Sequence, residues 1–389
     1  MALPASGTLS LNDIKTEFNG VNPIAMNAYY RGGAYTTSNN TSVPTSGAIS
    51  ISNFYGASNT VGTTWTQAAT YTNNTTAFIS VVYGAGRYIA VGSGRSPTTT
   101  STMLYSTDGD TWTGSTAIYS VYTSSPTGIY FVNGTFLAIG GGATTNAAYS
   151  TDGITWTPTL IKASTQYGVG GFTAPQTTVW NGTNYINATA AGNVLVSTDL
   201  ITWSIKAAIY NPRNLVYASG LGKVFGVPGF NGTGANQDWV VSTSNSGTSW
   251  ATQNISTLLG WSSATILDHV YYNGSVLFVT GNDPFSNPTL RAATSTDGTT
   301  WTDVSTALAL GSSYIYAAVW GGANWVLSYT NYNVYTSLNL SSITNAPTAF
   351  SAMGSNPSPG LATNSSGQLV LLGGGYYQSN GPTYAIKSP

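Results

Sequence analysis

The chain has 389 residues, a formal net charge of −1 at pH 7 and a hydrophobic fraction of 41%. This apolar content excludes an intrinsically disordered chain. The ten Lys and Arg residues are scattered singly, which excludes a basic patch for nucleic acid or an anionic membrane. The chain has no cysteine, and it abounds in Gly, β-branched and aromatic residues, which favours an all-β protein with many tight turns.

Residues 1–57 differ in pattern from the rest and predict a small N-terminal domain with short helices. The segment "SGTLSLNDI" (6–14) returns as "SGAISISNF" (46–54). Ser10 and Asp13 form a helix N-cap pair ahead of Ile14 and Phe18, which share one helix face. Asn22-Pro23 opens a second predicted helix, which ends before Gly32. So short a segment buries little surface alone, so we expect it to need the following domain, a partner chain or its own copies.

Residues 58–389 contain a repeat of about 45 residues. Each unit opens with two apolar strands joined by a Gly-containing turn, and Asn133-Gly134, Asn181-Gly182 and Asn273-Gly274 indicate type I′ hairpins. A third strand ending in "YST" and a fourth carrying "TWT" follow. The seven hairpins are at 81–92, 129–140, 178–189, 215–227, 269–281, 318–330 and 361–373. Four strands per unit at this period predict a β-propeller, here with seven blades.

The two ends of this region predict how the ring closes. The segment "VGTTWTQ" (61–67) is a fourth strand without a unit before it, and "TYAIKS" (383–388) is a third strand without a fourth after it. Pairing them completes the seventh blade and removes an exposed sheet edge. The sixth unit, "VYTSLNLSSIT" (334–344), lacks the Asp and Trp of the others.

A nine-residue string, "YSTDGDTWT" (105–113), recurs with small changes in several units. Its aspartate is Asp108 here, and Asp152, Asp199 and Asp297 in three later copies. It resembles the Asp-box of sialidase-type propellers, Ser-x-Asp-x-Gly-x-Thr-Trp, but is one residue shorter. An Asp carboxylate accepts backbone N–H bonds across a tight turn, Gly permits positive φ, and Trp buries a large ring. The resemblance implies a structural box on the face away from any active site, so we interpret these four Asp residues as turn-forming.

Catalysis is not expected. The sialidase resemblance would require a Tyr nucleophile with a Glu, an acid Asp and an arginine triad, but the only Glu, Glu17, lies outside the propeller. The remaining acids, Asp110, Asp238, Asp268, Asp283 and Asp303, leave a glycosidase pair possible without a supporting motif. His269, the only histidine, is interpreted as structural rather than as a base. No metal or cofactor motif is present, so none is predicted.

The first 57 residues carry three marks in order: the Ser-Gly-x-Leu/Ile-Ser pair, "YYRGG" (29–33) and "NFYGA" (53–57). They resemble a module at the start of many structural proteins of tailed bacteriophages, especially marine phages. The resemblance implies a virion protein of the tail, fibre or baseplate, assembled in the host cytoplasm and exposed on the particle. Its implied partners are other virion proteins, bound through 1–57, and copies of itself. A soluble bacterial protein of unknown role is the alternative.

A ligand site is predicted on the propeller face that carries the long connections, between strands two and three and between units. These segments hold exposed aromatic and polar residues, which suit sugars because rings stack on C–H faces. The candidate glycan-binding residues are Arg95, Tyr167, Phe230, Trp239, Asp283, Phe285, Tyr376 and Tyr377. The expected function is therefore non-enzymatic recognition of a host-surface glycan. A purely structural head or tail decoration and a glycosidase acting on host polysaccharide remain alternatives.

Overall fold

The fold is known from a computed structural model, and it is described for most of the chain. The described residues are 3–18, 20–31, 35, 36, 40, 42–58, 66, 67, 76–94, 102–114, 126–140, 147–161, 175–189, 193–206, 214–228, 237–244, 249–283, 289–310, 313, 315–329, 333–345, 357–364, 368–373 and 384–388.

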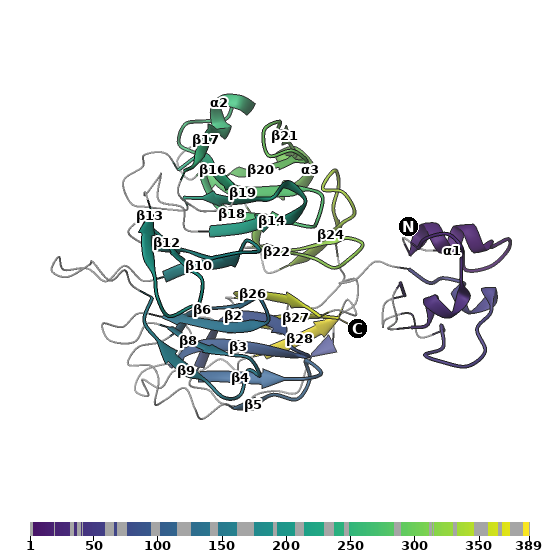
Figure 1. The fold of residues 1–389 in the computed structure, drawn as a ribbon. Helices are drawn as coiled ribbons and strands as arrows, with labels where there is room; N and C mark the ends of the chain where they lie inside the picture. Colours follow the sequence, from purple (N-terminus) through teal and green to yellow (C-terminus); the bar gives the residue numbers. More distant parts are fainter. Residues whose placement is uncertain are drawn as a thin grey trace.

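The strands form four-stranded antiparallel sheets, and the described part of the chain contains seven of them (Figure 1). The first three sheets are β2 (Thr76–Gly84), β3 (Arg87–Gly94), β4 (Thr102–Ser106), β5 (Thr113–Gly114); β6 (Pro126–Val132), β7 (Thr135–Gly140), β8 (Ala147–Ser150), β9 (Thr157–Thr159); and β10 (Pro175–Trp180), β11 (Tyr185–Thr189), β12 (Val194–Ser197), β13 (Ser204–Lys206). The next three are β14 (Asn214–Ala218), β15 (Lys223–Val227), β16 (Trp239–Ser244), β17 (Ala251–Asn254); β18 (Ile266–Tyr272), β19 (Leu277–Asp283), β20 (Thr289–Ser295), β21 (Thr302–Asp303); and β22 (Ile315–Trp320), β23 (Trp325–Tyr329), β24 (Val334–Ser337), β25 (Thr344–Asn345). The seventh holds β26 (Pro357–Thr363), β27 (Leu369–Gly373), β28 (Tyr384–Ser388) and β1 (Thr66–Gln67).

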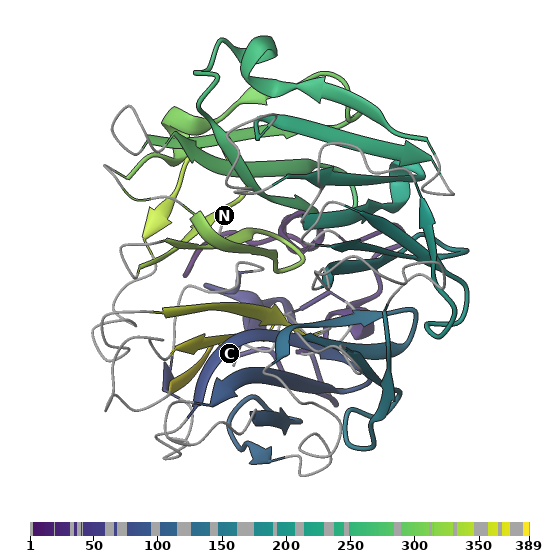
Figure 2. The same cartoon turned by 90° about the vertical axis from the view of Figure 1, so that its left-hand side faces the viewer.

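The sheets stand around a common centre, with the first strand of each sheet innermost (Figure 2). First strands contact one another in the cycle β2, β6, β10, β14, β18, β22, β26 and back to β2. The last sheet joins the two ends of the propeller region, because β1 pairs antiparallel with β28, Thr66 opposite Lys387. The all-β propeller with four-stranded sheets is therefore confirmed.

Apolar clusters between neighbouring sheets form the core. One cluster joins the first two sheets through Ile89, Phe136 and Trp156, and another joins the fifth and sixth through Phe278, Trp325 and Tyr329. Because each sheet buries both faces against its neighbours, its strands carry near-continuous apolar runs rather than strict alternation. Within the described residues the helices of the propeller are single-turn elements: η4 (Ser219–Leu221), α2 (Ile255–Leu259) and α3 (Ser305–Leu308).

The N-terminal segment has a core of its own, built around Ile14, Phe18, Tyr29 and Phe54, all at most 1% exposed. Helix α1 (Leu11–Glu17) begins at the predicted cap, since Ser10 Oγ accepts from the Asp13 backbone N–H and the Asp13 carboxylate accepts from the Ser10 N–H. The second copy of the repeat builds the same capping box with Ser50 and Asn53 ahead of η2 (Ile51–Phe54).

The two copies also exchange tyrosine contacts. The Tyr55 hydroxyl donates to the Gly7 carbonyl at 2.7 Å, and the Tyr30 hydroxyl donates to the Gly47 carbonyl. Each Gly has a positive φ, 95° at Gly7 and 84° at Gly47. The internal repeat is therefore a structural duplication. A tyrosine that follows each copy in the sequence donates a hydrogen bond to the glycine of the other copy.

The prediction for the second N-terminal helix was wrong in position. The Asn22–Pro23 peptide is cis, and the helical turn is the 3₁₀ element η1 (Met26–Tyr29), three residues later than Pro23. This short turn buries Tyr29 in the N-terminal core.

Two of the three Asn-Gly turns also differ from the prediction. Asn133 and Gly134 both have positive φ, as a type I′ turn requires. At Asn181-Gly182 and Asn273-Gly274 only the Gly has positive φ, and the turns span four residues, 181–184 and 273–276, instead of two. Asn181 Oδ1 accepts from the Thr183 and Asn184 N–H groups, and Asn273 Oδ1 makes the corresponding pair of bonds.

No helix in the described part of the chain is long and apolar enough to cross a membrane.

Candidate functional site

The repeated Asp residues form self-contained turns between the third and fourth strands. Asp152 Oδ1 accepts from the Ile154 and Thr155 N–H groups, both at 2.8 Å, and Ser150 Oγ donates to the same oxygen. Backbone bonds from Ile154 and Thr155 hold the pKa of Asp152 at about 2. Asp108, Asp199 and Asp297 accept the corresponding pair of backbone N–H groups. These are the contacts expected of turn-forming carboxylates.

The glycine of the box is required by close packing as well as by backbone conformation. Gly298 has φ of 71°, and a Cβ placed there would lie 2.3 Å from Phe225 Cζ of the preceding sheet. A Cβ at Gly153 would lie 2.5 Å from Ile89 of the preceding sheet. A Cβ at Gly109 would lie 2.7 Å from Val370 of its preceding sheet. The box turn thus also fixes the contact between neighbouring sheets.

The third and sixth sheets keep the turn with a leucine in place of that glycine. Leu200 and Leu340 have φ of 65° and 63° and are 4% and 1% exposed, so their side chains fill the gap between sheets. In the sixth sheet, Ser337 Oγ accepts from the Leu340 N–H and Asn339 Oδ1 accepts from the Ser341 N–H. The unit that lacked an Asp and a Trp in the sequence therefore retains the same turn, with Asn339 in the place of Asp.

Most of the predicted glycan-binding residues lie outside the described residues: Arg95, Tyr167, Phe230, Phe285, Tyr376 and Tyr377. The described strand ends that flank the long connections lie at the edge of the propeller opposite the Asp turns, because second strands end there and third strands begin there.

Trp239 and Asp283 are described, and both lie beside the start of β18. Trp239 begins β16 and is half-buried, and the Gln237 carbonyl two residues earlier accepts from the Leu267 N–H at 2.9 Å. Asp283 ends β19 beside Asn282, which pairs with Ile266. Asp283 is 1% exposed, so its carboxylate is not presented on the surface, contrary to its predicted role as a glycan contact.

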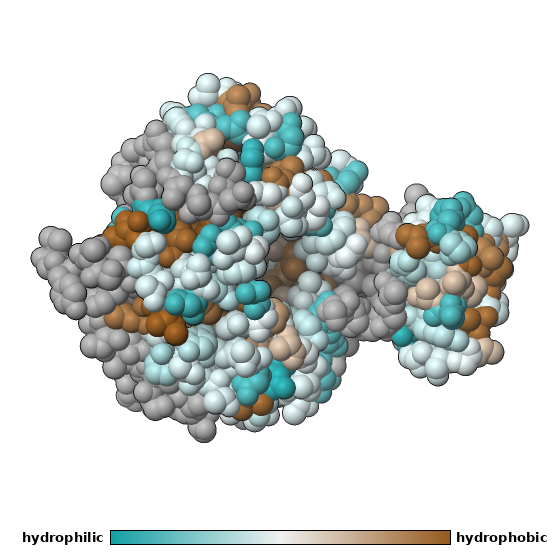
Figure 3. Space-filling model, viewed as in Figure 1, coloured by the Kyte–Doolittle hydropathy of each residue, from teal (hydrophilic) through white to brown (hydrophobic). Residues whose placement is uncertain are grey.

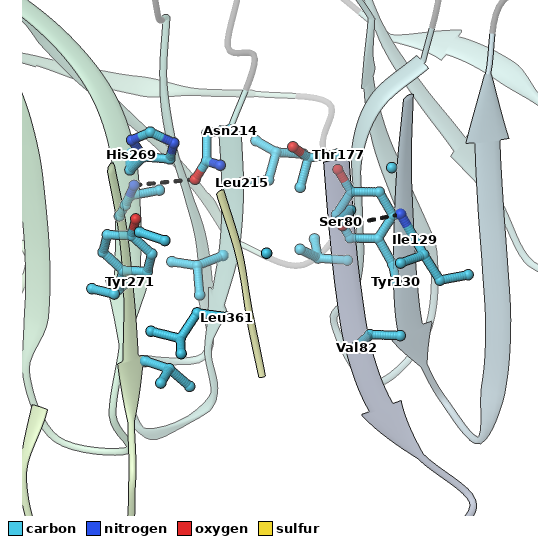
Figure 4. Close-up of a pocket in the computed structure, with 18 of the residues that line it drawn as sticks. Ser80, Val82, Ile129, Tyr130, Thr177, Asn214, Leu215, His269, Tyr271 and Leu361 are labelled. Atoms are coloured by element: carbon cyan, nitrogen blue, oxygen red, sulfur yellow. Dashed lines mark hydrogen bonds between the residues drawn. The ribbon is translucent and has the colours of Figure 1, made fainter. Parts of the chain in front are cut away.

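A central channel, which the sequence analysis did not identify, runs between the first strands. It has a volume of about 810 Å³ and is lined by residues of all seven first strands (Figure 4). Its polar lining residues gather where these strands begin, at the edge that carries the long connections. Val82, Tyr271 and Leu361 line a deeper part.

One position of the repeat builds the polar end of the channel. Ser80, Gly128, Thr177, Leu215, His269, Ala317 and Gly360 occupy equivalent places near the start of the seven first strands, and all of them line the channel; Asn214, which also lines it, comes one residue before Leu215. Two of the polar lining residues, Asn214 and Ser80, also join neighbouring sheets. Asn214 Oδ1 accepts from the Val270 N–H at 3.1 Å, and Ser80 Oγ accepts from the Ile129 N–H at 3.4 Å (Figure 4). Alignment of the seven hairpins would have shown this column of residues.

The fifth sheet contributes the carboxylate and the histidine of the described channel lining. A β-bulge between Leu267 and His269 brings two consecutive side chains, Asp268 and His269, to the lining. Burial raises the pKa of Asp268 to about 6 and lowers the pKa of His269 to about 4. Asp268 Oδ2 accepts from Asn282 Nδ2 at 3.3 Å, and His269 Nδ1 is buried without a hydrogen-bond partner. His269 thus lies in the channel as a neutral imidazole at pH 7.

The described residues contain no group of three or more His, Cys, Asp or Glu side chains that could hold a metal ion.

Similar solved structures are propellers. The chain resembles YCF48 bound to D1 peptide, with a TM-score of 0.56, 15% identity, and coverage of 83% of this chain and 94% of that chain. It also resembles the WD40 β-propeller domain of Doa1 (TM-score 0.52, 12% identity, 83% and 96% covered). A third similar structure is the extracellular domain of a hybrid two-component system of B. thetaiotaomicron (TM-score 0.55, 9% identity, 81% and 40% covered). No protein-family model and no curated protein matches the chain. At these identities the likeness establishes the β-propeller fold alone.

Proposed function

We propose that the protein is a bacteriophage virion component whose propeller binds a host-surface glycan without cleaving it. In this proposal residues 1–57 attach the chain to other virion proteins, and the edge with the long connections faces the host. Trp239 belongs to the recognition surface, together with Arg95, Tyr167, Phe230, Phe285, Tyr376 and Tyr377.

The observation that supports this proposal most directly is the direction in which the chain enters the propeller. As a fourth strand, β1 begins at the edge of the Asp turns, and β28, a third strand, ends at that edge. Figure 1 draws the N-terminal segment on the same side of the propeller as the C-terminal end. The long connections join strand ends at the opposite edge, so attachment and recognition would use opposite faces.

The non-catalytic part of the proposal is supported by the acids of the channel. A glycosidase generally needs two facing carboxyl groups. Among the described residues that line the channel, Asp268 is the only carboxylate. The four box carboxylates are bonded to their own turns at the other edge.

Single sites of this kind would bind weakly, because a shallow polar site buries little apolar surface. Several copies on one particle raise the effective affinity by about 10² to 10⁴ without new contacts. The N-terminal segment would provide these copies. Its exposed large apolar residues, Leu11, Val21 and Ile51, offer contact points for a virion partner (Figure 3).

The test is a glycan array probed with an oligomerised propeller, together with a variant in which Phe230, Trp239, Phe285 and Tyr377 are replaced by Ala. We expect the variant to lose array binding and phage carrying it to adsorb poorly. Unchanged adsorption would contradict the recognition role and favour a structural decoration. Release of reducing ends from host polysaccharide would favour a glycosidase.

We further infer that the seven sheets close into one seven-bladed ring, as the seven hairpins predict. The cyclic contacts between first strands support this inference. An experimental structure of the propeller checks the blade count, and a gap between β26 and β2 would contradict it.

A further inference from the structure

The central channel contains a negative charge without a positive partner among its described lining. Asp268 is the only carboxylate of that lining, and the described lining residues include no Lys or Arg. The hydrogen-bond donor to its carboxylate is the neutral amide of Asn282. Buried carboxylates are normally paired, because removal of a charge from water is costly. Within the described lining of the channel, Asp268 therefore has no cationic side chain beside it.

The surroundings of Asp268 match a cation that donates hydrogen bonds. The adjacent His269 ring is neutral at pH 7 because burial depresses its pKa, so one ring nitrogen offers a lone pair. Nδ1 is buried from solvent, so Nε2 is the ring nitrogen that can accept from a channel ligand. Tyr271 and Tyr316 also line the channel, and aromatic faces attract cations. A volume of about 810 Å³ accommodates a small organic molecule.

We propose that the channel binds a primary ammonium group, with Asp268 as its counter-ion and the His269 ring as a second acceptor. An ammonium group has three N–H donors, which suits a carboxylate and an imidazole placed side by side on one bulge. The group could be carried by an amino sugar or by a simple alkylamine. This site shares no residue with the surface proposed above for glycan recognition, and it does not depend on that function.

His269 makes the proposal directly testable, because it is the only histidine of the chain. Its ring gives a single set of imidazole signals, so a ¹H–¹³C NMR titration of the full-length protein at pH 7 reports on the channel without further assignment. The probes are D-glucosamine, N-acetyl-D-glucosamine and n-butylamine. N-Acetylation removes the charge and leaves the sugar ring, whereas butylamine keeps the charge and lacks the sugar.

We expect saturable shifts of the His269 signals with glucosamine, with butylamine or with both, and at least tenfold weaker binding of N-acetylglucosamine. Asp268→Asn should weaken ammonium binding at least tenfold, since hydrogen bonds to charged groups contribute about 1.5–3 kcal/mol and tenfold corresponds to about 1.4 kcal/mol. Asp110→Asn is the matched control, because Asp110 stands at the variable position of a box turn that Ile154 occupies in the next sheet. It should bind like the wild type.

Three results would overturn the proposal. The first is that neither amine shifts the His269 signals, and the second is that N-acetylglucosamine binds as tightly as glucosamine. The third is that Asp268→Asn binds the amines like the wild type while its spectrum shows a folded protein. Relative affinities of glucosamine and butylamine identify the carrier of the ammonium group.

Discussion

At the residue scale, the glycine of the box turn is required for two reasons: its backbone is left-handed, and a side chain there would collide with the preceding sheet. Substitutions can separate the two. Gly298→Ala places a side chain at φ of 71° and within 2.3 Å of Phe225 Cζ. Gly134 has a similar φ of 73°, but a Cβ there meets nothing within 4 Å. Gly134→Ala should therefore cost about 1–2 kcal/mol for the backbone alone, and Gly298→Ala about 1–3 kcal/mol more for overpacking. Thermal unfolding of the two variants checks this, and equal losses would contradict the packing contribution.

Asp268 predicts an unusual dependence of stability on pH. Burial raises its pKa from 3.8 in the unfolded chain to about 6 in the folded protein, so its ionisation destabilises the fold as pH rises between these values. Asp268→Asn should therefore raise the free energy of unfolding by up to ~3 kcal/mol at pH 7, and the gain should disappear below about pH 4. His269 titrates in both proteins, so the difference between them isolates Asp268.

Chemical denaturation at pH 3.5, 5 and 7 measures this difference. A variant that is less stable than the wild type at pH 7 would mean that the carboxylate already has a stabilising partner in the protein, and would count against Asp268 as the counter-ion of a bound ammonium group.

Residues of the box could be predicted from sequence because their chemistry is local. Ser150, Asp152 and Gly153 bond within a few residues of one another, so the turn follows from the string itself. The role of Asp268 could not be predicted in this way. Its surroundings depend on which described residues the other first strands bring to the channel, and none of these is cationic.

At the scale of the element, the sixth sheet shows that the turn survives without its typical residues. Leu340 accepts a left-handed backbone and fills the space between sheets, where it packs with Phe278. Leu340→Gly should relieve the backbone by about 1 kcal/mol but lose about 2–5 kcal/mol of packing, so we expect net destabilisation. Leu338→Ala is the control, because Leu338 is 54% exposed. Thermal midpoints of both variants decide between packing and backbone as the dominant effect.

Strands were predicted correctly where the sequence repeat is clear. Turn types were predicted less well, because they were inferred from two residues, Asn-Gly, alone. The third and fourth strands follow from "YST" and "TWT", and β1 and β28 were paired correctly across the chain. The Asn-Gly turns at 181 and 273 were assigned the wrong type, because they span four residues and the Asn side chain closes them by accepting backbone N–H bonds. The start of η1 was misplaced because Pro at a helix start is a tendency only.

At the scale of the whole molecule, β1 closes the last sheet although it contributes few residues. Removal of residues 1–57 should leave the thermal midpoint of the propeller nearly unchanged, because the core of that segment contains only its own residues. Removal of residues 1–67 deletes β1 as well and leaves β28 as an exposed edge. We expect the second truncation to unfold at lower temperature and to aggregate, since open sheet edges pair with other chains.

Calorimetry and size-exclusion chromatography of the two truncations measure this contribution. Identical behaviour would show that the ring is stable without β1.

The pairing of Thr66 with Lys387 also has a consequence for synthesis. The β1 segment leaves the ribosome 321 residues before its partner, which at about 5–20 residues per second corresponds to roughly 15–65 s of waiting. During that interval earlier sheets can form in order, each on the one before, because their strands are consecutive in the chain. Among the described sheets, the one with β1 joins strands that are far apart in the chain, so this sheet can form only after β28 has been synthesised. A stalled or truncated chain would present an open ring.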